Sequence, residues 1–444
     1  MGIEHGWRSQ FTATEPGISL GIYRITFGLL MCFSLGRFMY KGWIESCYLE
    51  TKFHFTYQYF HWVKPLESPV LMYGLVIVAM VSALFIALGI AYRFWIFTFF
   101  LLFTYLELIE KSWYLNHYYF VAIIAFLLCW MPADRRLSMS QLFKKTIPKH
   151  VPKLFSNILK LQISLVYFFA GLAKLNGDWL FQGMPLNIWL KAKVDIAWIG
   201  NYLAYDEMAY LFSYAGVLYD LSIPFLLWNR RSRPFALVAV VVFHCMTALL
   251  FNIGMFPWIM IVGSLIFVTD KEWQHLFSRL KEKASPQYLP APQQGVPHWL
   301  KALFVIHFAI QLILPNRHLL YSENQLWTER HYRFAWNVML IEKTGHAIFK
   351  VKDHPSGKTW VVYPSTHLST IQEKQMSFQA DMIWQYAQFL KSEYQASGLI
   401  DFSVYVEDWV AFNGRPSQLY LPLDLDLLDT SEDSIYDFVT PLKQ

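Results

Sequence analysis

Residues 70–109 read VLMYGLVIVAMVSALFIALGIAYRFWIFTFFLLFTYLELI, two apolar runs separated only by Tyr92 and Arg93. A helix needs about 20 predominantly apolar residues to cross the hydrocarbon core of a bilayer. The first run, 70–91, meets this length, and the second, 94–109, approaches it. The stretch therefore predicts two neighbouring membrane-spanning helices, and with them the class of fold.

Similar runs recur along the first 315 residues. Nine are present, at residues 18–39, 70–91, 94–109, 118–131, 158–175, 210–228, 234–251, 253–268 and 299–314. The runs that begin at Phe94, Tyr118 and Ile253 are short, so they either lengthen through their polar ends or are partly re-entrant. We therefore expect a mainly α fold, a polytopic transmembrane helical bundle of eight to nine spans. The first run lacks a basic leader and a cleavage signal, so it should stay in the mature protein.

The composition of the whole chain agrees with a lipid bilayer as its solvent and partner. Of the 444 residues, 55% are hydrophobic and 16% are charged, whereas about 25% are charged in a typical soluble domain. This balance argues against a soluble enzyme and against an intrinsically disordered chain. The net charge of +5 is modest and is gathered in a few loops, so nucleic acid is not an expected partner.

Cysteine and histidine spacing predicts no metal centre. The four cysteines are Cys32, Cys47, Cys129 and Cys245, and three of them lie within apolar runs. Neither an HxxxH nor a CxxC spacing is present. We therefore expect neither a zinc site nor a disulfide framework.

Basic residues gather in the loops after the fourth, sixth and eighth runs. They are Arg135, Arg136, Lys144, Lys145, Lys149 and Lys153 in the first loop, Arg230, Arg231 and Arg233 in the second, and Lys271, Arg279, Lys281 and Lys283 in the third. The third loop also contains a proline-rich linker at 285–297. Because basic loops stay on the cytoplasmic side, nine spans would put the N-terminus in the cytoplasm and the C-terminal region outside it.

From about Tyr321 the apolar runs give way to β-rich pieces such as 359–363 and 402–412, and the turn sequence NGRP follows at 413–416. One amphipathic helix interrupts them, because Phe378, Met382, Tyr386 and Leu390 recur every four residues. We therefore expect two domains: a transmembrane helical domain at 1–315 and a small α+β extracytoplasmic domain at 320–444.

Lys174 closes the stretch 165–175, LVYFFAGLAKL, which is otherwise uncharged. A lysine at the end of a span either snorkels to the membrane interface or faces a cavity. In a cavity, the loss of solvation favours the neutral amine, which can take a proton from a substrate. Its position in the sequence leaves both alternatives open.

Two histidines lie at membrane depth, His244 near the middle of the seventh run and His117 at the start of the fourth. Three interpretations are open: a core imidazole hydrogen-bonded to a neighbouring helix, a pair of haem ligands, or proton handling beside a base. The first suits His244. The third suits His117, because Asn116 is adjacent and can orient it, and Glu110 lies seven residues earlier.

Further charged residues lie within or at the ends of the apolar runs. Glu107 and Glu110 lie one helical turn apart, so they either act as an acid–base pair or sit at the membrane interface with Lys111 or a partner histidine. Asp220 in the sixth run and Arg24 in the first are each expected to form a structural ion pair between helices.

Five separated blocks follow one another in a set order. They are KSWYLNH at 111–117, VYFFAGLAKLNGDW at 166–179, FHCMTALLFNIGMF at 243–256, NQLWTERHYRFAWNVM at 324–339 and ADMIWQYA at 380–387. This series resembles the vitamin K-dependent gamma-carboxylase family, in its short microbial type. In addition, YRITFGLL at 23–30 and FHFTY at 53–57 are similar to the broader HTTM domain. The resemblance covers most of the chain.

The resemblance implies an enzyme that deprotonates vitamin K hydroquinone and combines it with dioxygen. The resulting strong base removes a γ-proton from a protein or peptide glutamate, and carbon dioxide then traps the carbanion. In this family the base is the lysine of the AGxxKL block, which falls on Lys174, and its histidine partner falls on His117. By analogy, Tyr167, His244, Tyr332 and Trp336 would line the quinone and glutamate pocket.

Two departures from the animal members of the family concern the capture of the substrate. Those members carry a lysine immediately before the base, where this chain has Ala173, and they use a disulfide, whereas this chain has no cysteine after Cys245. A quinol epoxidase without peptide carboxylation is therefore one alternative function.

A non-enzymatic membrane component is the other alternative. A b-type cytochrome would use His117 and His244 as haem ligands. A transporter would use the intramembrane carboxylates Glu107, Glu110 and Asp220.

Overall fold

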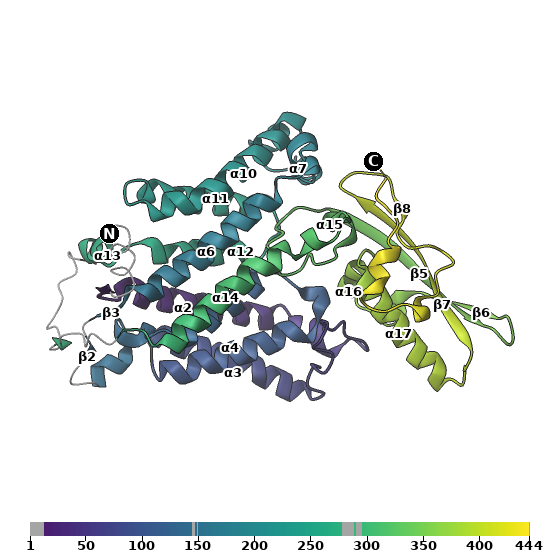
Figure 1. The fold of residues 1–444 in the computed structure, drawn as a ribbon, viewed down its shortest axis with the longest axis horizontal. Coiled ribbons are helices and arrows are strands. Elements are labelled where there is room, and N and C mark those ends of the chain that lie inside the picture. The colour runs from purple at the N-terminus through teal and green to yellow at the C-terminus, as the bar shows by residue number, and fades with distance from the viewer. Residues whose placement is uncertain (1–12, 144–146, 149, 278–287, 290–294, 444) are drawn as a thin grey trace.

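The computed structural model describes residues 13–143, 147–148, 150–277, 288–289 and 295–443, which form a helical bundle with a small sheet domain at one end (Figure 1). Within these residues, seven helices are long and apolar enough to cross a membrane. They are α2 (Ile18–Tyr40), α3 (Pro69–Leu88), α4 (Tyr92–Ile109), α6 (Lys153–Ala173), α10 (Asp206–Trp228), α11 (Arg233–Leu250) and α14 (His298–Asn316), which a 3₁₀ turn extends to Leu320. The prediction of a mainly α chain with several candidate membrane spans is confirmed.

Two of the nine predicted runs form shorter helices. The run at 118–131 corresponds to α5 (Asn116–Cys129), and the run at 253–268 to α12 (Phe256–Ser264) with a 3₁₀ turn to Phe267. Pro132 follows α5 closely, and Gly254 adopts a left-handed conformation (φ 62°) just before α12, so neither helix extends further. The short run from Phe94 does lengthen through a polar end, because α4 begins at Tyr92 and includes Arg93.

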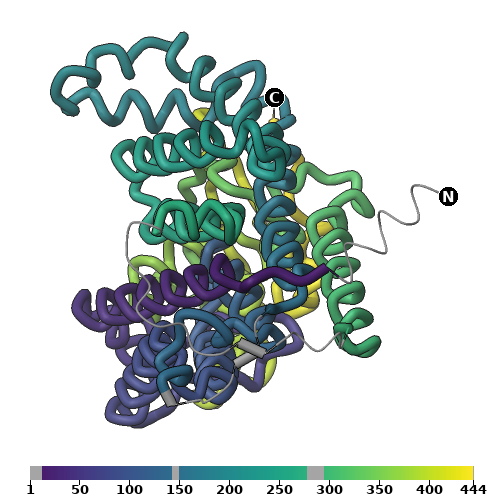
Figure 2. Tube along the Cα trace, turned by 90° about the vertical axis from the view of Figure 1, so that its left-hand side faces the viewer, coloured from purple at the N-terminus to yellow at the C-terminus, as the bar shows by residue number. Residues whose placement is uncertain are grey.

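The helices pack as two groups, visible when the bundle is turned by 90° (Figure 2). Helices α2 to α5 pack in succession, and α10 packs on both α6 and α11. Helix α12 contacts α11, α6 and α2, so it connects the two groups. Shorter helices complete the first part of the chain: α7 (Gly177–Gln182), α8 (Leu186–Lys191), α9 (Gly200–Leu203), α13 (Asp270–Phe277) and α15 (Gln325–Thr328).

Arg24 is buried in the first group, and no carboxylate of the described residues pairs with it. Its guanidinium donates to the carbonyl oxygens of Ile86 (2.6 Å), Ala87 (2.7 Å), Ala133 (3.1 Å) and Leu137 (2.6 Å). Two of these carbonyls belong to the last turn of α3, where a helix lacks internal donors and its dipole attracts a cation. The prediction of an ion pair for Arg24 is therefore wrong, because backbone carbonyls satisfy the charge.

The C-terminal domain contains a four-stranded antiparallel sheet in the order β6-β5-β7-β8. Its strands are β5 (Lys343–Asp353), β6 (Thr359–Val362), β7 (Phe402–Phe412) and β8 (Gln418–Leu419), and its helices are α16 (Thr370–Met376) and α17 (Ala380–Ala396). The predicted β-rich pieces coincide with β6 and β7. The predicted amphipathic face is also confirmed, because Met382, Tyr386 and Leu390 are fully buried against the sheet.

The turn after β7 joins this domain to the helical bundle. Asn413 and Gly414 both have positive φ (45° and 79°), as the NGRP sequence predicts. Arg415 then makes a two-pronged contact with Asp178 of α7, with N–O distances of 2.9 and 2.7 Å. Burial alone would raise the pKa of Asp178, but hydrogen bonds from Arg415 and Asn413 lower it below its usual value.

Two-residue strands tie the other end of the bundle together. Strand β1 (Thr14–Glu15) pairs with β3 (Val151–Pro152), and β2 (Ile147–Pro148) pairs with β4 (Tyr288–Leu289). Six basic residues of the predicted cytoplasmic loops lie outside the described residues, as does most of the linker at 285–297: Lys144, Lys145, Lys149, Arg279, Lys281 and Lys283.

Candidate active site

Lys174 follows the last residue of α6, and its side chain turns into the protein. Its Nζ donates to Asp220 Oδ2 of α10 at 2.7 Å and to the carbonyl oxygen of Ala170 at 3.2 Å. Lys174 is 6% exposed and Asp220 is 5% exposed. The predicted interhelical ion pair of Asp220 is therefore confirmed. Snorkelling, the first alternative for Lys174, is wrong because the amine is held inside the bundle.

A glycine allows these two helices to approach closely enough for the pair to form. A Cβ atom at Gly171 would lie 2.7 Å from Leu221 Cδ2 and 3.2 Å from Asp220 Cβ. Trp179 of α7 completes the surroundings of the amine, since its ring centroid lies 5.4 Å from Lys174 Nζ. The indole is fixed in place because its Nε1 donates to the carbonyl oxygen of Ser213 at 3.0 Å.

Lys174 and Asp220 line a cavity of about 70 Å³. The other polar side chains on its wall are Tyr167, His244 and Thr247, and the remaining wall is apolar or aromatic, with Trp179, Phe212, Phe243, Phe256 and Met339 among its members. A space of this size holds only a few water-sized groups. Electrostatic interactions are strong in such apolar surroundings. Because little water can enter, a proton at this site exchanges mainly between the amine and the carboxylate.

Tyr167 and His244 form a second polar pair on the same wall. The hydroxyl of Tyr167 and Nε2 of His244 lie 2.9 Å apart. The other ring nitrogen, Nδ1, is buried and has no hydrogen-bond partner among the described residues. His244 is therefore a core imidazole bound to a neighbouring helix, as the first interpretation predicts, and it retains one nitrogen that can bind a ligand.

His117 lies in the first turn of α5, and it is 6% exposed. Its ring centroid is 6.1 Å from that of Phe256, and Phe256 in turn lies 5.7 Å from His244. The Nε2 atom of His117 is buried without a hydrogen-bond partner in the described part of the chain. His117 does not line the cavity, but it lies beside Phe256, which does.

The side chains of Asn116 and Glu110 form hydrogen bonds with residues other than His117. Asn116 Nδ2 donates to the carbonyl oxygen of Asn337 at 2.7 Å. Glu110 interacts with the backbone N–H groups of Phe55 and Ser112 and with the side chains of His54 and Gln372. Within the described residues, neither side chain hydrogen-bonds to His117. Both fasten this segment to other parts of the protein, and their support of His117 stays a prediction.

The structure separates the four residues predicted to line the pocket. Tyr167 and His244 lie on the wall of the Lys174 cavity, whereas Tyr332 lines separate polar cavities and Trp336 stacks on Tyr119 with centroids 5.0 Å apart. Two other residues of the same segment, Val338 and Met339, reach the Lys174 cavity. The block at 324–339 was predicted to line the pocket. Which of its side chains face the cavity depends on the local turns of its backbone.

Trp179, Phe256 and Met339 are three of the wall residues that sequence reasoning missed. Each is the last residue of one of the five blocks. Its place in a block could therefore have marked it as a candidate residue of the site. No comparable signal exists for the contact between Lys174 and Asp220, since 46 positions separate these residues.

Two family models together cover almost the whole chain. Residues 12–273 match the HTTM domain, and residues 296–444 match the lumenal domain of vitamin K-dependent gamma-carboxylase. The chain belongs to the vitamin K-dependent gamma-carboxylase family. No solved structure matches it. Both parts of this carboxylase-family chain build the cavity, because Lys174 and Asp220 lie in the HTTM match and Met339 lies in the lumenal-domain match.

Proposed function

We propose that the chain is an integral membrane enzyme that couples epoxidation of vitamin K hydroquinone to carboxylation of protein or peptide glutamate. Dioxygen and carbon dioxide are its co-substrates. The observation that carries this proposal is the buried Lys174–Asp220 pair on the wall of an apolar cavity, in a chain of the gamma-carboxylase family.

The residues around the cavity fit a reduced quinone. Aromatic and aliphatic walls suit its rings, and the unpartnered Nδ1 of His244 suits a hydroxyl group. When bound, the reduced quinone and dioxygen supply the strong base that removes the γ-proton of glutamate.

Lys174 and Asp220 handle the first proton in this proposal. The ammonium group of Lys174 first gives a proton to Asp220 across their 2.7 Å hydrogen bond. The neutral Nζ atom then accepts the proton of a quinol hydroxyl group. The apolar walls exclude water, which protects a strong base from being quenched. His117 is the proposed partner of this site, and it lies beside Phe256 of the cavity wall.

We also propose an orientation and a division into domains. The N-terminus is cytoplasmic, and a transmembrane domain at 1–315 is followed by an extracytoplasmic α+β domain at 320–444. The basic loops and the match to a lumenal domain support this arrangement. A reporter that is active only in the cytoplasm, fused after Gln444, should be silent, and activity would contradict the orientation.

A direct assay tests the proposed function. Purified full-length protein receives reduced vitamin K, bicarbonate and a glutamyl peptide, with Lys174→Ala as the matched control. Epoxide and carboxylated peptide should both form with the native chain only. Epoxide alone would identify a quinol epoxidase without peptide carboxylation. If neither product forms, the enzymatic proposal fails, and a Soret band or an ion flux would then identify the non-enzymatic alternative.

A further inference from the structure

A second and larger cavity lies between the helical bundle and the C-terminal domain. Its volume is about 540 Å³. Aromatic side chains form much of its wall: Tyr57, Tyr59, Phe60, Tyr321, Tyr332 and Phe334. Four cations also line it, namely Lys111, Arg317, Arg330 and Arg333.

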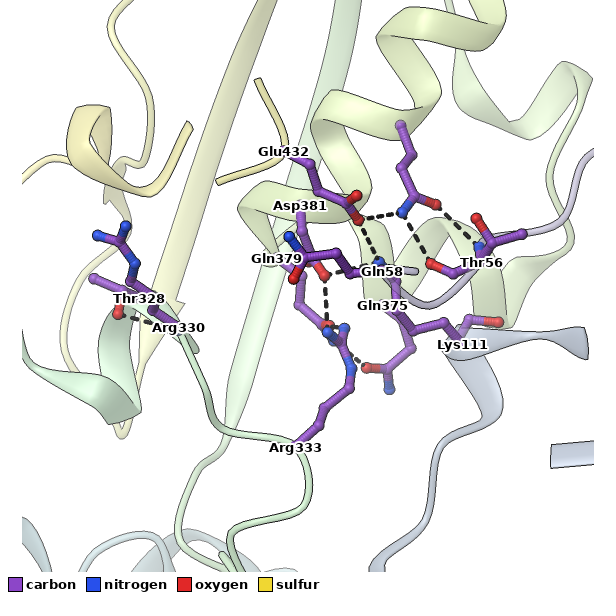
Figure 3. A network of polar contacts seen from close by, with 12 residues as sticks. Thr56, Gln58, Lys111, Thr328, Arg330, Arg333, Gln375, Gln379, Asp381 and Glu432 are labelled. Carbon is purple, nitrogen blue, oxygen red and sulfur yellow. Dashed lines mark hydrogen bonds and ion pairs between the residues drawn. The ribbon is translucent and has the colours of Figure 1, made fainter. Parts of the chain in front are cut away.

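Three of these cations are neutralised by carboxylates, as Figure 3 shows in part. Lys111 Nζ and Arg333 Nη1 each lie 2.8 Å from Asp381 Oδ2. Arg330 pairs with Glu323 and Asp437 at 2.9 and 2.7 Å. Burial alone would raise the pKa of Asp381, but Arg333 and Lys111 outweigh it and hold the pKa below its usual value. These pairs are therefore complete without a ligand.

Arg317 differs from the other three cations. It has no carboxylate within 4.0 Å among the described residues, and its one hydrogen bond there runs from Nη2 to the carbonyl oxygen of Arg333. Its Nε atom is buried without a partner. A guanidinium has five N–H donors in a planar fork that matches a carboxylate. Arg317 is partly buried, and a partly buried guanidinium without a carboxylate partner is stabilised when an anion joins it.

The backbone between the two cavities is held in an uncommon conformation. Five residues that are not glycine have positive φ between positions 329 and 339: Glu329, His331, Phe334, Trp336 and Met339. Such strain persists only where the surroundings fix the backbone, and it is typical of functional sites. This segment lines the larger cavity with residues 329–334 and the Lys174 cavity with Val338 and Met339, so it contributes to both.

We propose that Arg317 binds the side-chain carboxylate of an acidic residue that flanks the reacting glutamate in the peptide substrate. This inference rests on the proposed function. The bound carboxylate is not that of the reacting glutamate, because the two cavities share no lining residue. The reacting glutamate is placed in the Lys174 cavity and its acidic neighbour in the larger cavity, because the segment 329–339 lines both. The aromatic walls suit a peptide better than a small inorganic anion.

Two peptides test this proposal on the full-length protein. Both contain one glutamate, and the residues on either side of it are aspartates in one peptide and asparagines in the other. The native chain should show the lower KM for the acidic peptide. Arg317→Gln should raise that KM about ten-fold or more, to the value of the neutral peptide. The KM for reduced vitamin K should stay unchanged.

The control variant is Lys350→Gln, which removes a charge from an exposed pair with Glu407 on the sheet and should change neither KM. Arg317→Lys keeps the positive charge but lacks the planar guanidinium, so it should give an intermediate KM. It replaces Arg317→Gln in the test if that variant does not fold. An unchanged peptide preference in the Arg317 variants would overturn the proposal. So would loss of the preference in saturating bicarbonate, which would identify a small-anion site.

A binding measurement separates this proposal from the proposed function. Anisotropy of a fluorescent form of the acidic peptide reports binding without turnover. If the native chain makes no epoxide yet binds this peptide through Arg317, the proposed function fails and the Arg317 site stands as a peptide site. If the native chain makes epoxide but binds both peptides equally, the Arg317 proposal fails alone.

Discussion

The Nζ atom of Lys174 and the Oδ2 atom of Asp220 lie 2.7 Å apart, and both side chains are buried. Taking two opposite charges out of water is costly, and only their mutual attraction and further hydrogen bonds offset that cost. A buried pair of this kind on the wall of an apolar cavity points to a chemical role. The pair, and not the lysine alone, is therefore the unit to test.

Lys174→Ala should abolish epoxide formation while the chain still folds. Removing a general base typically costs about 10²- to 10⁴-fold in rate. Lys174→Arg should not restore activity, because a guanidinium keeps its proton whatever its surroundings. Product analysis by chromatography measures both effects. Near-normal epoxidation by Lys174→Arg would exclude a base role for Lys174.

Asp220→Asn should also lower the rate of epoxidation, because the amide keeps the shape of the carboxylate but cannot hold the amine's proton. The same substitution in a Lys174→Ala background should have little further effect, since two residues that act as one unit are not additive. Rates of the two single variants and the double variant form the test. Additive losses would show that Asp220 acts independently of Lys174.

Gly171→Ala should reduce both activity and stability. The new Cβ would meet Leu221 at 2.7 Å and Asp220 at 3.2 Å, so the Leu221 side chain must shift, and any movement of α10 away from α6 would lengthen the ion pair. Overpacking of this kind costs about 1–3 kcal/mol. Thermal unfolding and the epoxidation rate measure the two effects.

Gly263→Ala is the matched control, because a Cβ there would meet Ile163 at 3.7 Å, an ordinary contact. This variant should keep its activity and its melting temperature. Normal activity of Gly171→Ala would mean that the close approach of α6 and α10 is not needed for the site.

The helical bundle was predictable because apolar length alone marks a membrane span, as the run at 70–91 shows. The contents of the active site were only partly predictable. Lys174 stands out as a charge in an apolar run, and so does Asp220, but their contact depends on Gly171 and the crossing of two helices. Arg24 stands out equally, yet its charge is satisfied by carbonyl oxygens, a partner that no residue pattern reveals.

Tyr167→Phe and His244→Ala should each slow epoxidation, and their effects should not add. Each removes one end of the 2.9 Å hydrogen bond between the two side chains, so the second change has no bond left to break. We expect a coupling of about 1 kcal/mol, roughly five-fold in rate. A double-mutant cycle of epoxidation rates measures it.

His117→Phe provides the comparison for this cycle. No hydrogen bond joins His117 to Tyr167 among the described residues, so the effects of His117→Phe and Tyr167→Phe should add. Coupling as large as that of the Tyr167–His244 pair would show that a bound quinone or a rearrangement links His117 to the cavity directly.

Asp408 of β7 provides a test of stability away from the active site. Its side chain is fully buried, and neither carboxylate oxygen has a hydrogen-bond partner in the described part of the chain. Burial raises its pKa well above the usual value, and Lys343 only partly opposes this. A folded-state pKa above that of the unfolded chain, about 3.9, means that the folded state is favoured below pH 4 and loses this stability as the pH rises.

Asp408→Asn should therefore raise the melting temperature at pH 7.5 by about 2–5 °C and have little effect at pH 4. The amide has the same shape as the protonated acid and cannot ionise. Thermal unfolding of the purified protein across this pH range measures the difference, and Asp401→Asn, at an exposed position, should leave the curve unchanged. A lower melting temperature for Asp408→Asn at pH 7.5 would mean that Asp408 is ionised and stabilised by Lys343.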